Sequence, residues 1–322
     1  LALSKAVRRN GLPSSLLDRV RSVEWPRDHD AALRRFVLHA QKWDGALDPL
    51  PLKFMEKLWW RQADPTWGIP DARKSEILLD DFLFYSFRFA DQLPELRLLR
   101  PPARHLPFNA TVRRTPNELL VLSQRPTLTL TTADPPNSPA TLAEIRDTTK
   151  EELADVYPIR PTIDLPEKHI YDDRDFYPYS DVSEDFVQTI LFGRVQNEKY
   201  PWTPNEILGS TVMHCFGAAL AQAKARYGDF IKGELPEPVV CQGVQICGDS
   251  LDFVVFQLNT LDLHDKNTTR NIAWIDGNNQ FFAGKPFWDE FNDVEALNVE
   301  VFTKFLAFLA NLSDKQPSSA TP

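Results

Sequence analysis

The spacing of apolar residues predicts helices in the first ninety residues. Apolar side chains recur every three to four positions in residues 31–43 and again in 72–90, where Asp30 and Asp71 can serve as N-caps. Pro51 can open a shorter helix between them. Some aromatic residues of this region could line a cofactor pocket, but helical spacing favours packing in the core. These aromatic residues are Trp43, Trp59, Trp60, Phe82 and Phe84.

Beyond residue 100 the pattern changes to short runs rich in β-branched residues, which predict strands. The expected strands are 108–114, 117–125 and 127–132. A hairpin turn at 115–117 joins the first two. Ser138 and Pro139 then open a helix that we expect to cover roughly 140–155.

Residues 157–202 show little periodicity and are rich in Pro, Tyr and Asp. A loop this long is uncommon inside a compact domain and usually serves as a binding or packing arm. We expect an extended arm that docks on another protein, because tyrosines offer a large contact area with few rotatable bonds. The candidate interface residues are Tyr157, Tyr171, Tyr177 and Tyr179. Packing of the arm on its own domain is the alternative.

The helix that follows has the strongest local signal in the chain. Thr203 and Glu206 form a capping box around Pro204, and the helix is expected to stop at Gly228. Small residues at 217–221 suit close packing against a sheet.

Apolar runs separated by turn residues predict an antiparallel meander near the C-terminus. The expected strands are 238–247, 251–260, 270–276 and 280–284, with a turn at 276–279 before the last. Gln257 and Asn259 share one face of their strand, because side chains two residues apart point the same way. We expect both amides to be hydrogen-bonded, within the protein or to a partner.

These elements define an α+β fold, with an N-terminal helical region followed by a mixed or antiparallel sheet packed with helices. We expect a mainly helical region at 1–95 and an α+β body at 96–312 that carries the arm. A last helix should cover 298–312, and residues 313–322 should form a flexible tail.

Charge is distributed unevenly along the chain. The net charge is −9, but residues 1–61 hold 12 Lys/Arg and 7 Asp/Glu, so the remainder carries −14. One acid-free basic stretch lies in that remainder and is broken by prolines. Clustered arginines suit phosphate contact, so we expect local RNA binding there. The residues are Arg97, Arg100, Arg104, Arg113 and Arg114. A basic N-terminal group is the weaker alternative, formed by Arg8, Arg9, Arg34 and Arg35. Simple solvation, or pairing with the chain's own acids, is the third possibility.

The sequence offers little support for catalysis. It contains no GxxxxGK[ST], GxGxxG, GxSxG or HExxH motif. His214 and Cys215 are neighbours on a helix and therefore point about 100° apart, which argues against a thiol–imidazole pair. A metal-dependent nuclease is the alternative function, with acids near the C-terminal strands as ligands. Its candidate acids are Asp249, Asp252, Asp262 and Asp276, but the position that wants an acid and a lysine reads Gln257-Leu258-Asn259.

The three cysteines form no CxxC pair, and six strand residues would separate Cys241 from Cys247 by about 20 Å. We therefore expect three free thiols in a reducing compartment. No apolar run reaches the roughly 18 residues needed to span a bilayer, so we expect no membrane contact.

Four stretches in order resemble one family, the mitochondrion-specific large ribosomal subunit protein thirty-seven. They are "YPIRPTIDLPEKHIYD" at 157–172, "FGAALAQAKARYG" at 216–228, "VVFQLNTLDL" at 254–263 and "RNIAWID" at 270–276. The likeness runs from about Gly11 to Asn311. A paralogous family, formerly small-subunit protein thirty, shares the strand "QLNT", but "IDLPEKHIYD" is more similar to the first family.

The resemblance implies a structural, non-catalytic component of the mitochondrial ribosome's large subunit, located in the matrix. Its implied partners are large-subunit proteins, especially the paralogue, with limited contact to mitochondrial rRNA. No cofactor, metal, membrane or small-molecule substrate is implied. An acidic body with one local arginine cluster agrees with this interpretation.

Overall fold

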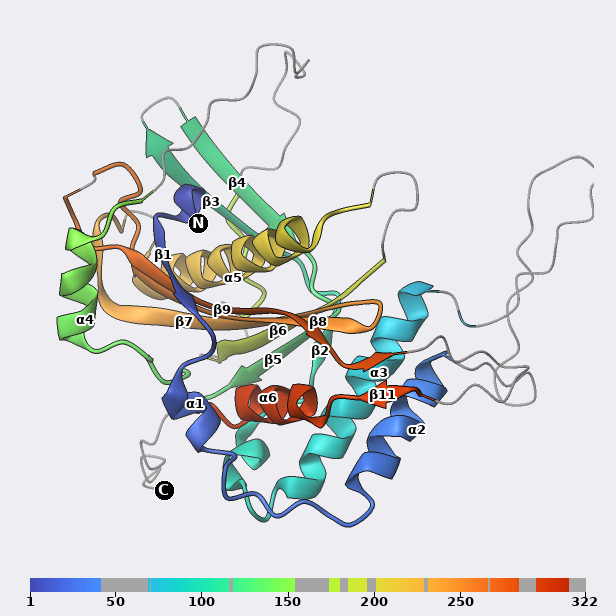
Figure 1. The fold of residues 1–322 in the computed structure, drawn as a ribbon. Coiled ribbons are helices and arrows are strands. Elements are labelled where there is room, and N and C mark those ends of the chain that lie inside the picture. The colour runs from blue at the N-terminus through green and yellow to red at the C-terminus, as the bar shows by residue number, and fades with distance from the viewer. Residues whose placement is uncertain are drawn as a thin grey trace, which may run out of the picture.

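The computed structural model describes residues 1–41, 69, 71–115, 118–153, 174–179, 185–195, 201–228, 231–265, 267–283 and 294–312 (Figure 1). Its centre is a seven-stranded mixed sheet with helices on both faces, so the predicted α+β class is confirmed. The strands in spatial order are β1 (Ala6–Asn10), β9 (Asn271–Gln280), β8 (Ser250–Thr260), β7 (Glu234–Cys247), β6 (Phe186–Arg194), β5 (Leu128–Thr132) and β2 (Ala103–Arg104). Strands β7, β8 and β9 form the predicted antiparallel meander.

Strand β6 lies inside the stretch expected to be an irregular arm, so that expectation is wrong for residues 186–194. It pairs in parallel with β7 and antiparallel with β5, near the middle of the sheet. Residues 187–191 are buried. A strand buried on both faces lacks the alternation of apolar and polar residues that identifies a half-exposed strand. The sequence signal was therefore a short apolar run, hidden among prolines, tyrosines and aspartates.

The N-terminal region also differs from the expectation of helices alone. Strand β1 pairs in parallel with β9, from Ala6 opposite Asn271 to Asn10 opposite Ile275. It is short, and three of its five residues are polar. Its apolar pattern is therefore too brief to predict a strand, and its place is set by pairing with a partner 265 residues further along the chain.

Residues 276–279 belong to β9 and do not form the expected turn. The pairing of β8 with β9 shifts register between Leu251 and Phe253, and Asn278 has a φ of 58°. The Asn278 backbone N–H donates to Asp252 Oδ1 at 2.7 Å. Turn-forming residues here produce a bulge within one strand. The segment beyond it contains β10 (Phe282–Ala283), which pairs with β11 (Ala296–Leu297) outside the large sheet.

One face of the sheet is covered by α5 (Pro204–Tyr227), and a hairpin of β3 (Phe108–Thr115) and β4 (Glu118–Gln124) covers α5 in turn (Figure 1). Helix α5 begins at the predicted capping box and ends at Gly228, as expected. Its small residues pack closely: a Cβ on Gly217 would lie 3.2 Å from the Leu122 Cβ of the hairpin. On the sheet side, a Cβ on Gly243 would collide with the Cys215 thiol.

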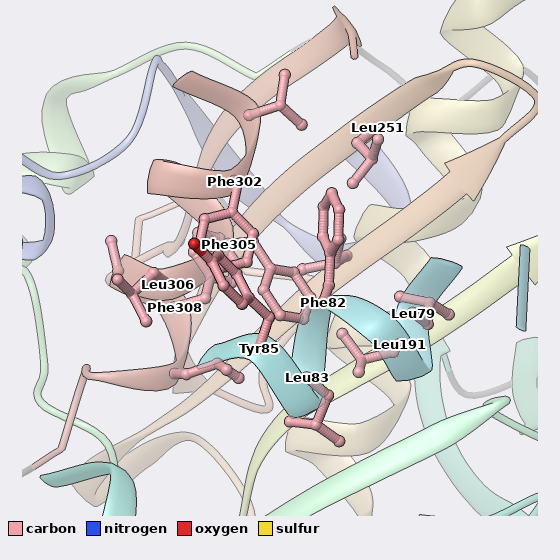
Figure 2. Close-up of a cluster of buried hydrophobic side chains, with 14 of the residues drawn as sticks. Leu79, Phe82, Leu83, Tyr85, Leu191, Leu251, Phe302, Phe305, Leu306 and Phe308 are labelled. Carbon is pink, nitrogen blue, oxygen red and sulfur yellow. The ribbon is translucent and has the colours of Figure 1, made fainter. Parts of the chain in front are cut away.

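The opposite face is covered by α1 (Ser14–Asp18), α2 (His29–Gln41), α3 (Asp71–Ser86) and α6 (Val299–Leu309). Phe82 lies at the centre of this core, with its ring edge-to-face against Phe281 and Phe302 at 5.0 and 5.2 Å between centroids. Figure 2 shows Phe82, Tyr85, Phe302 and Phe305 converging from α3 and α6. Such pairs contribute about 0.5–1.5 kcal/mol each beyond the area that they bury. The core thus joins the expected helical region to the sheet.

Several helix boundaries differ from the predictions. Helix α2 begins at His29, so Asp30 lies in its first turn and does not precede it. Helix α4 covers only Leu142–Asp147 and is capped by Thr141, while a 3₁₀ turn follows at Thr148–Lys150. The predicted helix at Pro51 and the tail at 313–322 lie outside the described residues. No helix in the described parts of the chain is both long enough and apolar enough to cross a membrane.

Candidate interaction surface

The amides of Gln257 and Asn259 are held inside the protein. Gln257 Oε1 accepts from the Ala140 backbone N–H at 3.1 Å, and Gln257 Nε2 donates to Asn259 Oδ1 at 2.9 Å. Asn259 Nδ2 donates to the Arg270 carbonyl at 2.8 Å, and its backbone N–H donates to Asn271 Oδ1 at 2.7 Å. The prediction that both amides are hydrogen-bonded is confirmed. Their partners lie within the chain, so these residues have a structural role.

A second buried polar group satisfies the C-terminal end of α6. Gln188 of β6 donates to the carbonyls of Phe308 and Leu309 at 2.8 and 3.0 Å. Gln242 of β7 also donates to Phe308 at 2.9 Å and accepts from Asn311 Nδ2 at 2.8 Å. The last carbonyls of a helix have no partner within the helix. Side chains from the sheet supply them here, which fixes α6 against the sheet.

His214 and Cys215 lie in different surroundings. The His214 ring stacks on Phe192, with centroids 4.2 Å apart and an interplanar angle of 16°. Burial, aided by the positive charge of Arg194, lowers the pKa of His214 to about 4. Cys215 is fully buried, and burial together with the neighbouring Cys241 raises the pKa of its thiol. Both groups are therefore neutral near pH 7. The three cysteines are free thiols, as predicted.

The acids of the nuclease alternative serve the sheet. Asp276 Oδ2 forms an ion pair with Lys304 Nζ of α6 at 2.7 Å. Asp252 accepts from the bulge at Asn278, and burial raises the pKa of its carboxyl group. Asp249 Oδ2 accepts from Gln280 at 3.0 Å. Within the described ranges, no three His, Cys, Asp or Glu side chains gather where a metal could bind. Nothing in this arrangement supports the nuclease alternative.

Three of the five candidate RNA-binding arginines form ion pairs with acids of their own chain. Arg97 pairs with Asp91, Arg100 pairs with Asp185 at 3.5 Å, and Arg104 pairs with Asp80 at 2.6 Å. The three arginine side chains remain 61%, 54% and 47% exposed. Exposed pairs of this kind contribute about 0–1 kcal/mol, so phosphates can compete for the arginines. RNA contact at these residues stays a prediction.

The other two arginines lie on a different sheet. Arg113 and Arg114 belong to β3 of the hairpin, whereas Arg104 belongs to β2 at the edge of the large sheet. Arg113 is exposed, and it lies about 16 Å along the strand from Phe108, at ~3.3 Å per residue. The side chain of Arg114 lies outside the described residues. The sequence cluster is thus divided: Arg113 and Arg114 lie on the hairpin, whereas Arg104 lies on β2 and Arg97 and Arg100 precede that strand.

Two of the four arginines in the alternative basic group also have partners within the chain. Arg9 forms a hydrogen-bonded ion pair with Glu151, which lowers the pKa of the Glu151 carboxyl group. Arg34 donates to the Val294 carbonyl at 2.7 Å. Arg8 and Arg35 are exposed.

Two of the four candidate interface tyrosines pack against their own domain. The Tyr177 side chain is buried, and its hydroxyl lies 3.1 Å from both the Asp185 carbonyl and Gln222 Oε1. Tyr179 is half-buried beside it, and burial raises its pKa to about 12. The adjacent Asp175 is clamped by Lys224 of α5 at 2.6 Å. Tyr157 and Tyr171 lie outside the described residues. Contact with another protein stays a prediction for all four.

A surface that the sequence did not predict lies between α2 and α3. A groove of about 520 Å³ is lined on its apolar side by Ala31, Ala32, Phe36, Phe84, Tyr85 and Phe87. Phe84 is 82% exposed, so its expected place in the core is wrong, whereas Phe82 is buried as predicted. Phe82 and Phe84 are two positions apart, which is about 200° around a helix. That angle is the signal that would have placed Phe84 outside.

The fold and these sites define a class: a mixed α+β protein whose buried polar side chains hold its own elements together, and whose exposed features are arginines and an apolar groove. No family model matches the chain. It is 27% identical to large ribosomal subunit protein mL37 of Gallus gallus over 322 residues, covering 95% of this chain and 68% of that protein. It is 33% identical to mL37 of Mus musculus over 210 residues, and 32% identical to mL37 of Rattus norvegicus over 206.

The mouse and rat alignments each cover 48% of the relative's own length, and 61% and 59% of this chain. The relatives from these three species are the same protein, mL37, and one of the three alignments extends along almost the whole chain. The chain is therefore similar to the mL37 large ribosomal subunit proteins along almost its whole length.

Proposed function

We infer that the chain is a structural component of the large subunit of the mitochondrial ribosome and thereby supports mitochondrial translation. The observation that carries this inference is the similarity to mL37 over 95% of the chain. The polar residues that first suggested chemistry are consistent with a structural role, because Gln257, Asn259 and Asp276 have partners within the fold.

The location follows from the same relatives. A component of the mitochondrial ribosome works in mitochondria, and we place it in the matrix, where translation takes place. Free thiols agree with a reducing compartment.

The partners that we propose are neighbouring large-subunit proteins, above all the paralogue, together with a limited stretch of rRNA. The net charge of −9 disfavours a broad RNA-coating surface, because each acid repels the phosphate backbone. We therefore assign most of the docking to protein contacts and the RNA contact to the exposed arginines.

Sedimentation tests this function directly. A tagged form of the full chain, expressed in mitochondria, is expected to sediment with the large subunit and with the assembled ribosome through a sucrose gradient. Chelation of Mg²⁺ should separate the subunits and leave the tag in the large-subunit fraction. A tag that remains at the top of the gradient, while a known large-subunit protein sediments normally, would contradict the proposal. Depletion of the protein should lower the labelling of mitochondrially encoded polypeptides.

A further inference from the structure

The groove between α2 and α3 has a rigid aromatic floor. The Tyr85 side chain is buried, and its hydroxyl lies 3.0 Å from His29 Nδ1 of α2. Phe36 packs edge-to-face on Tyr85 at 5.3 Å between centroids. Because the core of the protein fixes these rings, their side chains are already ordered before a ligand binds. A preformed apolar site loses less conformational entropy on binding than a flexible one.

The rim of the groove exposes apolar side chains to water. Phe84 is 82% exposed and Phe87 is 42% exposed, although both are large aromatic residues. Neighbouring exposed apolar residues around a concave surface are typical of interaction sites. The groove volume of about 520 Å³ lies in the usual range for sites that accept several side chains or a small molecule.

The charged side chains beside these rings determine which charge on a partner would be favoured. Arg88 pairs with Asp28 at 3.3 Å, and its guanidinium lies 5.9 Å from the centre of the Tyr85 ring. Arg35 is exposed at the same groove. The hydrogen bond from Arg88 lowers the pKa of Asp28, and the positive charge of Arg35 adds a smaller effect in the same direction. Two cations and one acid thus leave the groove with an excess positive charge. A carboxylate on the partner would complement Arg35.

The wider surroundings distinguish a peptide from RNA. Helices α2 and α3 together contain four Arg or Lys residues and five Asp or Glu residues. The two helices are therefore nearly neutral overall. A phosphodiester chain gains affinity from a run of cations, whereas a peptide needs only one carboxylate at Arg35 and apolar side chains elsewhere. Single-stranded RNA binding combines stacking aromatics with a basic track, and the basic track is missing from these two helices.

We propose that this groove binds an amphipathic, acidic segment of another protein, with apolar side chains against Phe36, Phe84 and Phe87 and a carboxylate on Arg35. The site is distinct from the five arginines assigned to RNA, although Arg35 also belongs to the alternative basic group near the N-terminus. It does not depend on the ribosomal function, because binding can be measured on the purified chain.

The test uses two designed helical peptides and the full chain. One fluorescein-labelled peptide carries leucines on one face and glutamates beside them, and its twin carries lysines in place of the glutamates. Fluorescence anisotropy is expected to show binding of the acidic peptide that is at least about tenfold tighter than that of its twin. Phe84→Ala should weaken acidic-peptide binding about tenfold, since central aromatic anchors carry a large share of the binding energy at such sites. Arg35→Glu should reverse the preference for charge.

The matched control is Leu142→Ala on α4, which removes another apolar side chain that is 70% exposed. Its affinity for the acidic peptide should equal that of the unmodified chain. Phe84 and Arg35 are exposed, so their variants are expected to fold, and circular dichroism verifies this. Equal affinity for the two peptides, or no binding at about millimolar peptide, would overturn the proposal.

Two further results would also overturn it by naming another occupant. If a labelled oligouridylate bound the chain and Phe84→Ala abolished that binding, the groove would be an RNA site. If sedimentation velocity showed self-association that Phe84→Ala removed, the occupant would be a second copy of the chain.

Discussion

A single buried amide connects three segments of the chain at Gln257. Its side-chain oxygen accepts a hydrogen bond from the backbone N–H of Ala140, which lies just before α4. Its side-chain nitrogen donates to Asn259 on the same strand. Asn259 in turn donates to the carbonyl of Arg270, the residue just before β9. A buried polar group left without a partner costs about 1–3 kcal/mol, so each member of this network depends on the others.

Replacing Gln257 with Met tests that dependence. Methionine has a similar length but leaves the Ala140 N–H and the Asn259 Oδ1 without partners. We expect the free energy of unfolding in urea to fall by about 2 kcal/mol or more. Gln280→Met on β9 is the control, because Gln280 is exposed and its loss should change stability by less than about 0.5 kcal/mol. Equal stability of the two variants would show that the network contributes nothing.

His214 gives the protein a predictable dependence on pH. Its pKa is lowered to about 4 in the folded state from an ordinary value of 6.5, since burial disfavours the charged ring. As the pH falls, the unfolded chain therefore binds the proton first, and stability is lost between about pH 6.5 and pH 4. The stability that the neutral ring allows is fully present above that window.

His214→Phe keeps an aromatic ring against Phe192 and removes the titration. We expect the unmodified chain to lose about 1–2 kcal/mol more than the variant between pH 7 and pH 5, as measured by urea unfolding at each pH. His29, whose pKa burial also lowers, is present in both proteins, and its effect cancels in the comparison. His264→Gln, at an exposed position, should behave as the unmodified chain does. Parallel pH profiles for all three would contradict the assignment to His214.

At the scale of elements, α5 approaches the sheet through Gly243 of β7. A Cβ there would collide with the Cys215 thiol and lie 3.3 Å from Thr211 Cγ2. Gly243→Ala is expected to lower the free energy of unfolding by about 1–3 kcal/mol, the usual cost of overpacking a core. Combining it with Cys215→Ala should restore part of that loss, because the second change removes the obstructing sulfur.

A double-mutant cycle in urea measures this coupling, which we expect to be at least about 0.5 kcal/mol. Gly209→Ala, also on α5, is the control: nothing lies within 4 Å of its added Cβ, and alanine favours helix, so this change should not destabilise. Strictly additive effects of Gly243→Ala and Cys215→Ala would show that the contact does not limit the packing.

Elements with strong local signals could be predicted from the sequence. The capping box at Thr203 and Glu206 placed the start of α5, and turn residues between apolar runs gave the order of β7, β8 and β9. Elements defined by distant partners could not be predicted. Strand β1 is placed by its pairing with β9. Strand β6 is placed by its pairing with β5, which precedes it in the chain, and with β7, which follows it.

The candidate sites divide in the same way. The hydrogen bonding of Gln257 and Asn259 follows from the alternation of side chains on a strand, which is local. Their partners at Ala140 and Arg270 come from other segments, and only the folded chain brings them together. The groove at Phe84 and Phe87 is likewise formed by two helices, so the sequence of either helix alone does not predict it.

For the molecule as a whole, the balance of charge governs how it can meet RNA. The net charge is −9, and the acids Asp91, Asp185 and Asp80 already hold three of the candidate arginines. The division of the arginines between β3 and the region around β2 gives two sets that can be tested apart. One set is Arg97, Arg100 and Arg104, and the other is Arg113 and Arg114.

Replacing all five arginines with Gln is expected to weaken the salt resistance of large-subunit association. Each phosphate contact that is lost lowers the slope of log affinity against log salt by about 0.7–0.9. The unpaired aspartates left behind would add repulsion. The effect is measured as release of the tagged chain from purified large subunits over increasing KCl. Variants of the two separate sets show which set makes the contact.

The control replaces five other arginines with Gln: Arg21, Arg27, Arg73, Arg146 and Arg226. If both five-residue variants are released at the same salt concentration as the unmodified chain, the RNA contact lies elsewhere. The basic N-terminal group then becomes the next candidate: Arg8, Arg9, Arg34 and Arg35.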